Sequence, residues 1–538
     1  MPINAIPLLI PGCGYKIDYA ARFRGSAATA YLYRTPVVAG NRRVFTYATW
    51  LRRTAIGGAG CQLLGAGPDA SNATILYLND GAGAGGPEQY AVNLLHIVGG
   101  AIAWAVYGLG KLRDQAGWYH IVVSVDLTAA SNKVRMWVNG AELSIVALTG
   151  AVTNSDTFIS STNQHWISRR HDAPSAYNDQ MLADNVLLDG VQVSSPASFG
   201  ALANAWTPKQ PSGLAFGPNG FCLEFRNPAA MGADTSGQGN HWTASGVLST
   251  DQMADTPTNV FATLDPLDTV GTLSNGALTL TAGASHCGSR ATLLPGGNVY
   301  FEATVAALTS VSAQAGIGLS RPQASLTGGL NTIANIWGMV WTNTRWRSVN
   351  GTSSGPAATA AAGAVMQMAF SPMTGDCWVG LDNVWFDSAN GTTGNPSTGA
   401  NPTFTALSGD LVPFFDAYGN AVTANFGQRP WAFTPPSGFK ALCTGAATLA
   451  MPTASGAFTG NLNAAGPRIH CDGSPTSLTI NGNPVIWGTH ALKLADGFKV
   501  ISPLAAYNAS GPNAWVAVMG SKIVTGDCRI PNNAQVNP

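Results

Sequence analysis

The sequence predicts a nearly all-β protein made of several antiparallel β-sandwiches of the jelly-roll type. The chain has 538 residues, more than one core supports, because single domains rarely grow past about 250 to 300 residues. Charged residues make up only 10% of it, while Gly (63) and Pro (32) are plentiful, so turns and short strands should dominate. Short apolar runs with a period of two recur along the chain, and a sustained helical period does not. We therefore expect two to four β domains.

The charge balance excludes several classes of partner. Lys plus Arg (27) equal Asp plus Glu (27), so no global field draws the chain to nucleic acid or to an anionic membrane. A near-neutral surface also lacks self-repulsion, which favours an oligomeric or particle-bound protein. The apolar opening stretch, residues 5–11, has no basic flank and is far shorter than the roughly 20 residues that span a bilayer. We expect no signal peptide and no membrane insertion.

The eight cysteines, at positions 13, 61, 222, 287, 377, 443, 471 and 528, form no CxxC pair and follow no regular spacing. Reduced and mostly buried thiols, from synthesis in a cytoplasm, are the preferred interpretation. A disulfide framework is the alternative.

The first β domain is predicted over residues 1–205. RVFTYATWLRR (43–53) alternates and is rich in aromatic and β-branched residues, which indicates a strand. In residues 118–143 two apolar runs flank a polar turn, and Asn139-Gly140 supplies a type I′ hairpin, so a three-stranded meander is expected. Only ASFGALANAW, near residue 200, offers a short helix.

A thinner strand signal separates this domain from the next. Residues 206–263 carry several X-Pro pairs and the string GADTSGQGNHW (232–242), which together predict an extended connector that packs on its neighbours.

A second β domain is predicted over residues 264–444. Alternation returns at 298–305, and residues 365–386 read as strand, turn and strand. Residues 388–402 should form a long exposed loop. After it, residues 445–538 gather strands around SLTINGNPVIW (477–487) and form a small C-terminal β module of unknown type. No block repeats at 20 to 50 residues, which excludes a solenoid or a propeller.

Catalytic and metal-binding patterns are missing. The eight histidines include no HExxH pair, although His165 and His171 in NQHWISRRHD remain weak ligand candidates. There is no GxSxG elbow, no P-loop and no ExDxxE strand of the kind that glucanases use. Single acidic residues fit turn roles, with a Ca²⁺ site from Asp172 or Asp179 as the alternative. We expect no catalytic residue, no metal and no cofactor. The single acidic residues that fit turn roles are Asp126, Asp172, Asp179, Asp184 and Asp189.

Several strings resemble a known family. Residues 21–53 followed by GWYHIVVSVDLTAASNKVRMWVNG (117–140) resemble phage structural proteins that open with a concanavalin A-like, laminin-G-like jelly roll. GADTSGQGNHW and ADTPTNVFATLDPL (254–267) carry the most specific likeness. The second domain resembles a SPRY domain through GNVYFEATV (297–305), AGIGLS (315–320) and NFGQRPWAFTPPSGF (425–439). IWGMVWTNTRWRSVNG (336–351) is richer in Trp than usual, and the last 95 residues carry no such resemblance.

One cluster is the candidate recognition site. Trp337, Trp341 and Trp346 gather with Arg345 and Arg347 beside a polar run, and the resemblance implies that SPRY loops here bind partners. Core filling is the alternative, and it is the preferred interpretation for the tryptophans of alternating strands, Trp50, Trp137, Trp378 and Trp385. The arginine pairs 42–43, 52–53 and 169–170 could contact a neighbouring subunit or an acidic glycan, with solvated surface as the alternative.

The resemblance implies a non-enzymatic bacteriophage virion protein, a tail fibre or related appendage that is assembled in the host cytoplasm. Its implied partners are other virion proteins and a host cell-surface glycan or protein, and its implied oligomeric state is a homotrimer. A capsid decoration or head-tail protein without a receptor role is one alternative. A glycan-degrading enzyme with a catalytic first domain is another.

Overall fold

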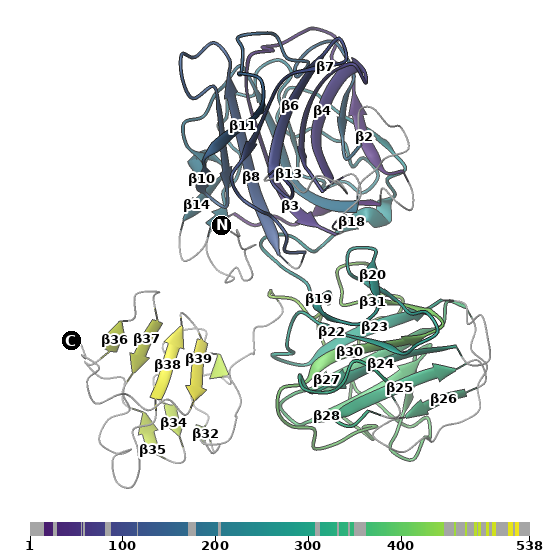
Figure 1. Ribbon diagram of the computed structural model, residues 1–538. Coiled ribbons are helices and arrows are strands. Elements are labelled where there is room, and N and C mark those ends of the chain that lie inside the picture. The colour runs from purple at the N-terminus through teal and green to yellow at the C-terminus, as the bar shows by residue number, and fades with distance from the viewer. Residues whose placement is uncertain are drawn as a thin grey trace.

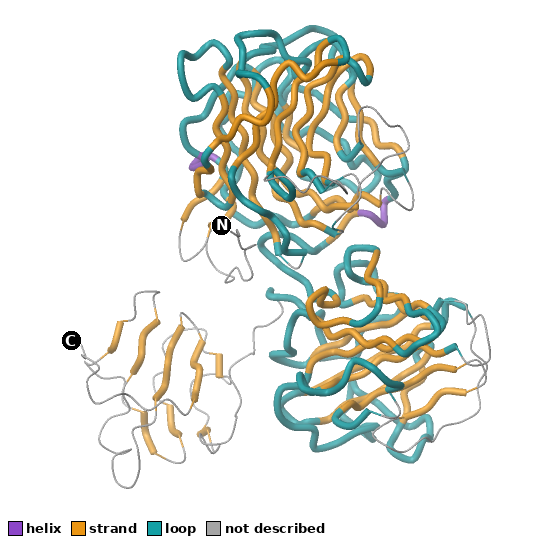
Figure 2. The backbone as a smooth tube through the Cα atoms, in the orientation of Figure 1, coloured by secondary structure: helices purple, strands orange, loops and turns teal. Residues whose placement is uncertain are grey.

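The computed structural model describes two β-sandwiches and the strands of a third unit, as Figures 1 and 2 show. It covers residues 15–24, 29–54, 56, 60–80, 88–115, 117–169, 179–202, 206–306, 313–330, 333–342, 345–348 and 362–445, and strand backbones between 457 and 526. Within these ranges the only helices are two 3-10 turns, Pro196–Ser198 and Ser249–Asp251. No helix there has the length and apolarity to cross a bilayer. The predicted all-β class is confirmed.

Two eight-stranded antiparallel sheets form the first sandwich. The β8 sheet has the order β10-β9-β8-β3-β13-β1-β18, with β16 beside β13, and the β5 sheet has the order β11-β7-β6-β5-β4-β12-β2-β17. The strands of the β8 sheet are β1 (Ala20–Arg24), β3 (Val44–Arg53), β8 (Trp118–Asp126), β9 (Val134–Val138), β10 (Ala141–Leu143), β13 (Asp179–Asp189), β16 (Phe221–Leu223) and β18 (Gln252–Met253). Those of the β5 sheet are β2 (Tyr31–Arg34), β4 (Cys61–Asp69), β5 (Asn72–Leu78), β6 (Val92–Val98), β7 (Ala101–Gly108), β11 (Ile145–Thr149), β12 (His165–Ile167) and β17 (Thr243–Ser245).

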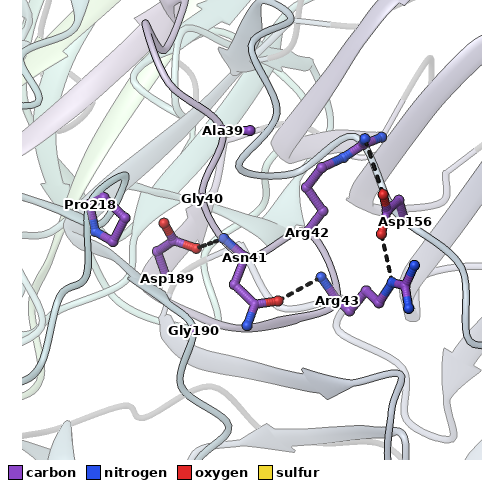
Figure 3. A pocket seen from close by; sticks show the side chains of 9 residues that line it. All are labelled: Ala39, Gly40, Asn41, Arg42, Arg43, Asp156, Asp189, Gly190 and Pro218. Atoms are coloured by element: carbon purple, nitrogen blue, oxygen red, sulfur yellow. Dashed lines mark hydrogen bonds and ion pairs between the residues drawn. The ribbon is translucent and has the colours of Figure 1, made fainter.

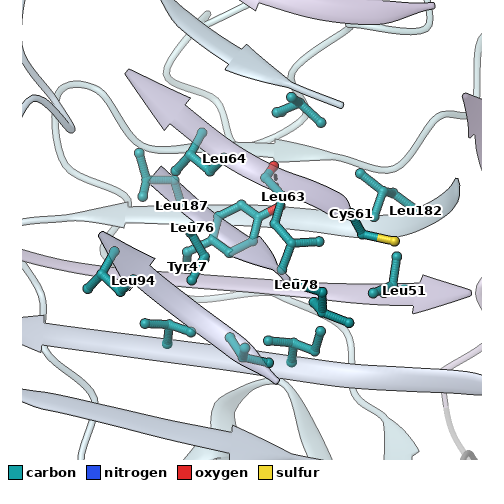
Figure 4. Packing of buried hydrophobic residues seen from close by; sticks show 14 of the residues in the cluster. Tyr47, Leu51, Cys61, Leu63, Leu64, Leu76, Leu78, Leu94, Leu182 and Leu187 are labelled. Carbon is teal, nitrogen blue, oxygen red and sulfur yellow. Dashed lines mark hydrogen bonds between the residues drawn. The ribbon is translucent and has the colours of Figure 1, made fainter. Parts of the chain in front are cut away.

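Alternate residues of the two sheets meet in the core between them. Figure 4 shows Tyr47 and Leu51 of β3 among leucines of the β5 sheet, including Leu76 and Leu94. Each fully buried leucine contributes about 1.5 to 3 kcal/mol. The predicted meander is present as β8, β9 and β10, and Asn139 and Gly140 have φ of 49° and 80°, as a type I′ turn requires.

The outer face of the β8 sheet is covered by the chain itself. Trp206 packs there with Trp50 and Trp118, while Phe199 and Phe216 pack with Trp137. The Trp206 indole Nε1 donates to His120 Nδ1 at 3.0 Å. The preferred interpretation of Trp50 and Trp137 as core residues is confirmed, and the central strands β3, β8 and β13 of this sheet are buried on both faces.

The predicted connector is wrong for most of its length. Within residues 206–263, β16 pairs with β13, β17 with β2 and β18 with β1. Trp242 lies in the first core, and β15 (Trp206–Pro208) pairs with β14 (Gly200–Leu202). Residues 206–253 therefore complete the first sandwich, and only 254–263 lead to the second. Strands of two or three residues are too short for alternation to reveal them.

The second sandwich also has two antiparallel sheets, ordered β19-β22-β30-β24-β25-β26 and β20-β21-β31-β23-β27-β28-β29. Phe301, Phe415 and Phe426 pack against one another at its centre, with Phe415 and Phe426 edge to face. The strands of the first sheet are β19 (Leu264–Thr269), β22 (Cys287–Ala291), β24 (Gln314–Ser320), β25 (Ile336–Thr342), β26 (Arg345–Ser348) and β30 (Val412–Tyr418). Those of the second are β20 (Thr272–Ser274), β21 (Thr279–Thr281), β23 (Val299–Val305), β27 (Val365–Ser371), β28 (Asp376–Leu381), β29 (Val384–Phe386) and β31 (Ala421–Asn425).

Strand backbones are also described in the C-terminal module. β34 (Leu478–Ile480) pairs with β35 (Asn483–Val485) across the predicted hairpin, and with β32 (Ala457–Phe458). A five-stranded sheet has the order β33-β39-β38-β37-β36. Its strands are β33 (Ile469–His470), β36 (Ala491–Lys493), β37 (Phe498–Ile501), β38 (Trp515–Met519) and β39 (Lys522–Gly526).

Polar contacts join the two sandwiches. Arg22 Nη1 of the first donates to Asn275 Oδ1 of the second at 2.8 Å. Arg52 Nη2 donates to Thr263 Oγ1 at 3.2 Å, and the backbone of Ala254 donates to that of Gln428 at 3.3 Å. Because the Arg52 contact is buried, separating the sandwiches would expose a charge pair and its partners.

Candidate functional site

The predicted tryptophan and arginine cluster lies on two paired strands at one edge of the second sandwich. β25 carries Trp337 and Trp341, and the backbone of Trp341 pairs with that of Trp346 on β26. Trp341 is 1% exposed and belongs to the second core. A recognition role for Trp341 is therefore wrong, because no ligand can reach its ring, and the core-filling alternative applies.

The rest of this cluster is only partly described. Trp337 is half-buried, and the Arg321 guanidinium lies 5.9 Å from its ring centroid. The side chains of Arg345, Trp346 and Arg347 lie outside the described residues, so their role stays a prediction.

The three arginine pairs differ in environment. Arg52 and Arg53 are buried, ion-paired with Asp255 and Asp80, so the surface role considered for this pair is wrong. Period-two alternation placed them on a strand but could not show that both faces of that strand are covered. Arg169 lies over the rings of Tyr31 and Trp166, at 5.2 and 5.4 Å, and Arg170 lies outside the described residues.

The string GADTSGQGNHW forms a loop that one carboxylate holds together. Asp234 accepts hydrogen bonds from the backbone of Cys222, Ser236 and Asn240 at 2.8 to 2.9 Å, and from the Ser236 hydroxyl at 2.8 Å. The Asn240 amide in turn donates to the Pro218 and Gly220 carbonyls. This distinctive motif is explained by structure rather than by ligand chemistry.

The closing string NFGQRPWAFTPPSGF is held in a similar way. Glu302 of β23, 2% exposed, accepts from the backbone N–H groups of Ala432 and Phe433 at 3.0 and 2.9 Å. It also accepts from the Tyr300 hydroxyl at 2.8 Å. Tyr300 and Trp431 then meet edge to face at 5.0 Å.

Buried histidines and thiols serve the cores. His165 is buried, accepts from the Ser160 N–H at 2.9 Å, and has its pKa lowered to about 4 by burial. Its partner in the weak ligand hypothesis, His171, lies outside the described residues. Five described cysteines are buried, at positions 61, 222, 287, 377 and 443, and the first four of them are free thiols. The prediction of reduced thiols is confirmed for Cys61, Cys222, Cys287 and Cys377.

A carboxyl pair that sequence reasoning missed lies beside the N-terminal segment. The Tyr15 hydroxyl is 3.1 Å from Glu224 Oε1 and 3.4 Å from Asp184 Oδ1. Asp184 sits at a bulge of β13 with φ of 41°, and burial, reinforced by Glu224, raises its pKa to about 7. A carboxyl group with a raised pKa suits acid–base chemistry, but Asp184 is 7% exposed and the Tyr15 hydroxyl lies against both carboxyl groups. No spacing along the chain signals this pair.

An open cavity of about 630 Å³ lies at the end of the first sandwich. Figure 3 shows Arg42 and Arg43 reaching the same carboxylate, Asp156, at 3.3 and 2.6 Å. On the other wall Asp189 accepts from the Asn41 N–H at 2.7 Å, and burial raises the pKa of Asp189. The arrangement can bind an anionic or polyhydroxylated ligand and lacks paired acid and base groups aimed into the space.

The outer face of the β5 sheet is aromatic. Leu32, Leu76 and Leu94 enter the core, so their strand neighbours point away from it. One cross-strand row consists of Thr243, Tyr33, Trp166, Gly65, Ile75, Leu95 and Ala105. The row contains no charged side chain. Trp166, Ile75 and Ala105 are only 6%, 3% and 3% exposed, so the accessible large side chains of the row are Tyr33 and Leu95.

Comparisons with known proteins agree with the first sandwich. Residues 26–195 match the model of the concanavalin A-like lectin/glucanases superfamily, which confirms the concanavalin A-like prediction there. No curated protein matches the chain.

Similar solved structures include the SPRY domain of human HERC1, with 14% identity over 31% of this chain and 99% of that one, TM-score 0.25. A heptameric SAP-like pentraxin from Limulus polyphemus has 12% identity over 37% and 98%, TM-score 0.27. Domains LG4-5 of the mouse laminin α1 chain have 10% identity over 79% and 97%, TM-score 0.27.

Proposed function

We propose that this chain is a non-enzymatic structural protein of a bacteriophage particle, a tail fibre or related appendage that recognises a host cell-surface glycan. The observation that carries the proposal is the pair of half-buried tyrosines, Tyr31 and Tyr33, on the aromatic outer face of the β5 sheet. Aromatic rings offer flat apolar surfaces with polar rims, which suit the alternating C–H and hydroxyl faces of sugars. Tyr31 and Tyr33 are half-buried and 5.8 Å apart, so part of each ring is accessible.

The joint between the sandwiches supports a structural role. Linked domains move relative to each other by default unless their interface is substantial. Here buried contacts of Arg52 with Asp255 and Thr263 tie the first sandwich to the start of the second. An appendage has to hold its recognition surface at a fixed orientation to the particle, and such a joint serves that need.

The balanced charge and low charged content fit a chain that assembles with sister chains and other virion proteins. Within a homotrimer, three shallow sugar sites would act together, because linked sites raise the effective concentration of one another. High affinity at a single site is then unnecessary.

The test is the position of the chain in particles and its binding to host cells. Purified particles are labelled with antibody against this chain and imaged, and fluorescent full-length chain is mixed with host cells before and after periodate oxidation of surface glycans. We expect label on the tail and periodate-sensitive binding. Label on the capsid lattice would favour a decoration protein, absence from particles would overturn the proposal, and shortened glycan products would indicate an enzyme.

A further inference from the structure

Two guanidinium groups at the mouth of the Arg42–Arg43 cavity share one carboxylate. Arg43 uses Nε to reach Asp156, and Arg42 uses Nη1. Within the described part of the chain, Nη2 of either arginine makes no hydrogen bond, and the two side chains are 30% and 43% exposed. The cavity therefore presents unused charged donors to solvent.

The second carboxylate of the cavity does not compete for these donors. Asp189 Oδ1 accepts from the Asn41 N–H at 2.7 Å, and Oδ2 accepts from the Asn219 N–H at 3.0 Å. Arg34 lies close enough to stabilise the charge of Asp189. Asp189 is thus a wall residue whose oxygens are already used, and Asp156 alone neutralises the arginine pair.

The walls are held in place before any ligand arrives. Gly40 N–H donates to the Ser160 carbonyl at 2.8 Å, and Gly190 N–H donates to that of Val44 at 2.9 Å. Arg42 is fixed through Nε, which donates to the Thr157 carbonyl at 2.7 Å. A preorganised site loses less conformational entropy on binding.

Size and lining favour a sugar over a peptide. About 630 Å³ lies within the usual range of small-ligand sites. Apart from the charged residues, the lining consists of Ala39, Gly40, Asn41, Gly190 and Pro218, which includes no large apolar side chain to form a pocket for a peptide anchor. Backbone groups and one amide can contact hydroxyls, while Pro218 offers an apolar surface to the C–H face of a ring.

We infer that this cavity binds a carboxylate-bearing sugar residue, whose carboxylate displaces Asp156 from Arg42 and Arg43. The inference rests on the proposed function, and it names the class of glycan recognised and a second contact site beyond the aromatic face. Displacement is feasible because exposed ion pairs are weak, and guanidinium groups recognise carboxylates through paired N–H donors. Asp156 then competes with the ligand for the two guanidinium groups. A neutral sugar cannot displace it, so the positive charge of the arginines does not raise the affinity for neutral sugars.

Because Asp156 competes with the ligand, substitution of an arginine and substitution of Asp156 should change the affinity in opposite directions. Binding of trigalacturonic acid to the purified full-length chain is compared with binding of its methyl ester, which keeps the shape and removes the charge, by ligand-observed NMR. Arg43→Gln should weaken binding of the acid by about tenfold, the usual effect of losing a charge-assisted hydrogen bond. Asp156→Asn should strengthen it several-fold, and neither change should alter binding of the ester.

Arg135→Gln is the matched control, because Arg135 is a partly exposed arginine paired with Glu142 outside the cavity. Thermal unfolding of each variant shows that the fold is intact. Equal binding of acid and ester, binding of neither, or weaker binding of the acid by Asp156→Asn would each overturn the inference. These outcomes are separate from the proposed function, since attachment of the chain to host cells and its position in particles are measured without this saccharide.

Discussion

Arg52 and Asp255 form an ion pair whose side chains are only 1% and 2% exposed, where the first sandwich meets the segment that leads to the second. Trp118 Nε1 donates to the same carboxylate at 3.2 Å. One carboxylate thus ties strands β3 and β8 to residues 254–263, and its loss would leave a cation without a partner.

Asp255→Ala should lower the free energy of unfolding by about 3 to 5 kcal/mol, because it leaves the buried Arg52 charge uncompensated. Urea unfolding followed by tryptophan fluorescence measures this. Glu142→Gln, which breaks an exposed ion pair, should change the free energy by no more than about 1 kcal/mol. Similar effects of the two substitutions would contradict a structural role for the Arg52 pair.

Arg52 also shows where sequence reasoning stops. Alternation over residues 43–53 predicts a strand, and β3 is that strand, because pleating alone sets the period of two. Whether the second face is accessible to water depends on residues far along the chain that cover it, which are Trp206 over Trp50, Phe199 and Phe216 over Trp137, and Asp255 against Arg52. Local periodicity carries no information about such long-range cover, so Arg52 and Arg53 looked like surface residues.

The candidate site was only partly predictable for the same reason. The sequence offers the arginine pair 42–43 as a possible contact for an acidic glycan, but Asp156 and Asp189, which complete the cavity, are more than 100 residues away along the chain. Trp341 shared its local pattern with surface aromatics and lies in the core. Tyr15, Asp184 and Glu224 meet through the fold alone.

Asp184→Asn should reduce the pH dependence of stability. The folded pKa of Asp184 is raised to about 7 from its ordinary value of 3.8, so the folded state holds a proton that the unfolded state releases. The stability it contributes is complete below about pH 4 and is lost as the pH rises to about 7. Asn mimics the protonated form and tolerates the positive φ of this position.

The measurement is the difference in free energy of unfolding between variant and wild type from pH 4 to 8. As the pH rises, the free energy of unfolding of the variant should increase relative to that of the wild type. The difference should become constant above about pH 7. Taking the difference removes the opposite trend from His120 and His165, whose lowered pKa values of about 3 and about 4 make the protein less stable as pH falls below the usual range of histidine. A constant difference would rule out titration of Asp184 in this window.

Glu302→Gln should loosen the closing segment of the second sandwich. The Gln side chain keeps the volume but loses the charge and places an NH₂ group near the N–H donors of Ala432 and Phe433. Hydrogen bonds to charged groups contribute about 1.5 to 3 kcal/mol, so exchange of these two amides should accelerate by roughly tenfold or more. Hydrogen exchange followed by mass spectrometry measures this exchange rate. Unchanged protection of both amides would contradict a role of Glu302 in holding the closing segment.

Substitutions at Trp341 and Trp337 separate packing from recognition in the cluster that the sequence suggested. Trp341→Ala should cost about 3 to 5 kcal/mol by leaving a cavity in the second core. Trp341→Phe, which keeps an aromatic ring, should cost less and leave binding to host cells at the wild-type level. Loss of cell binding by a Trp341→Phe variant whose melting temperature is unchanged would reinstate the recognition role.

Trp337 is half-buried against Arg321. Trp337→Ala should therefore lower the free energy of unfolding by less than Trp341→Ala does, because the Trp337 ring has fewer core contacts to lose.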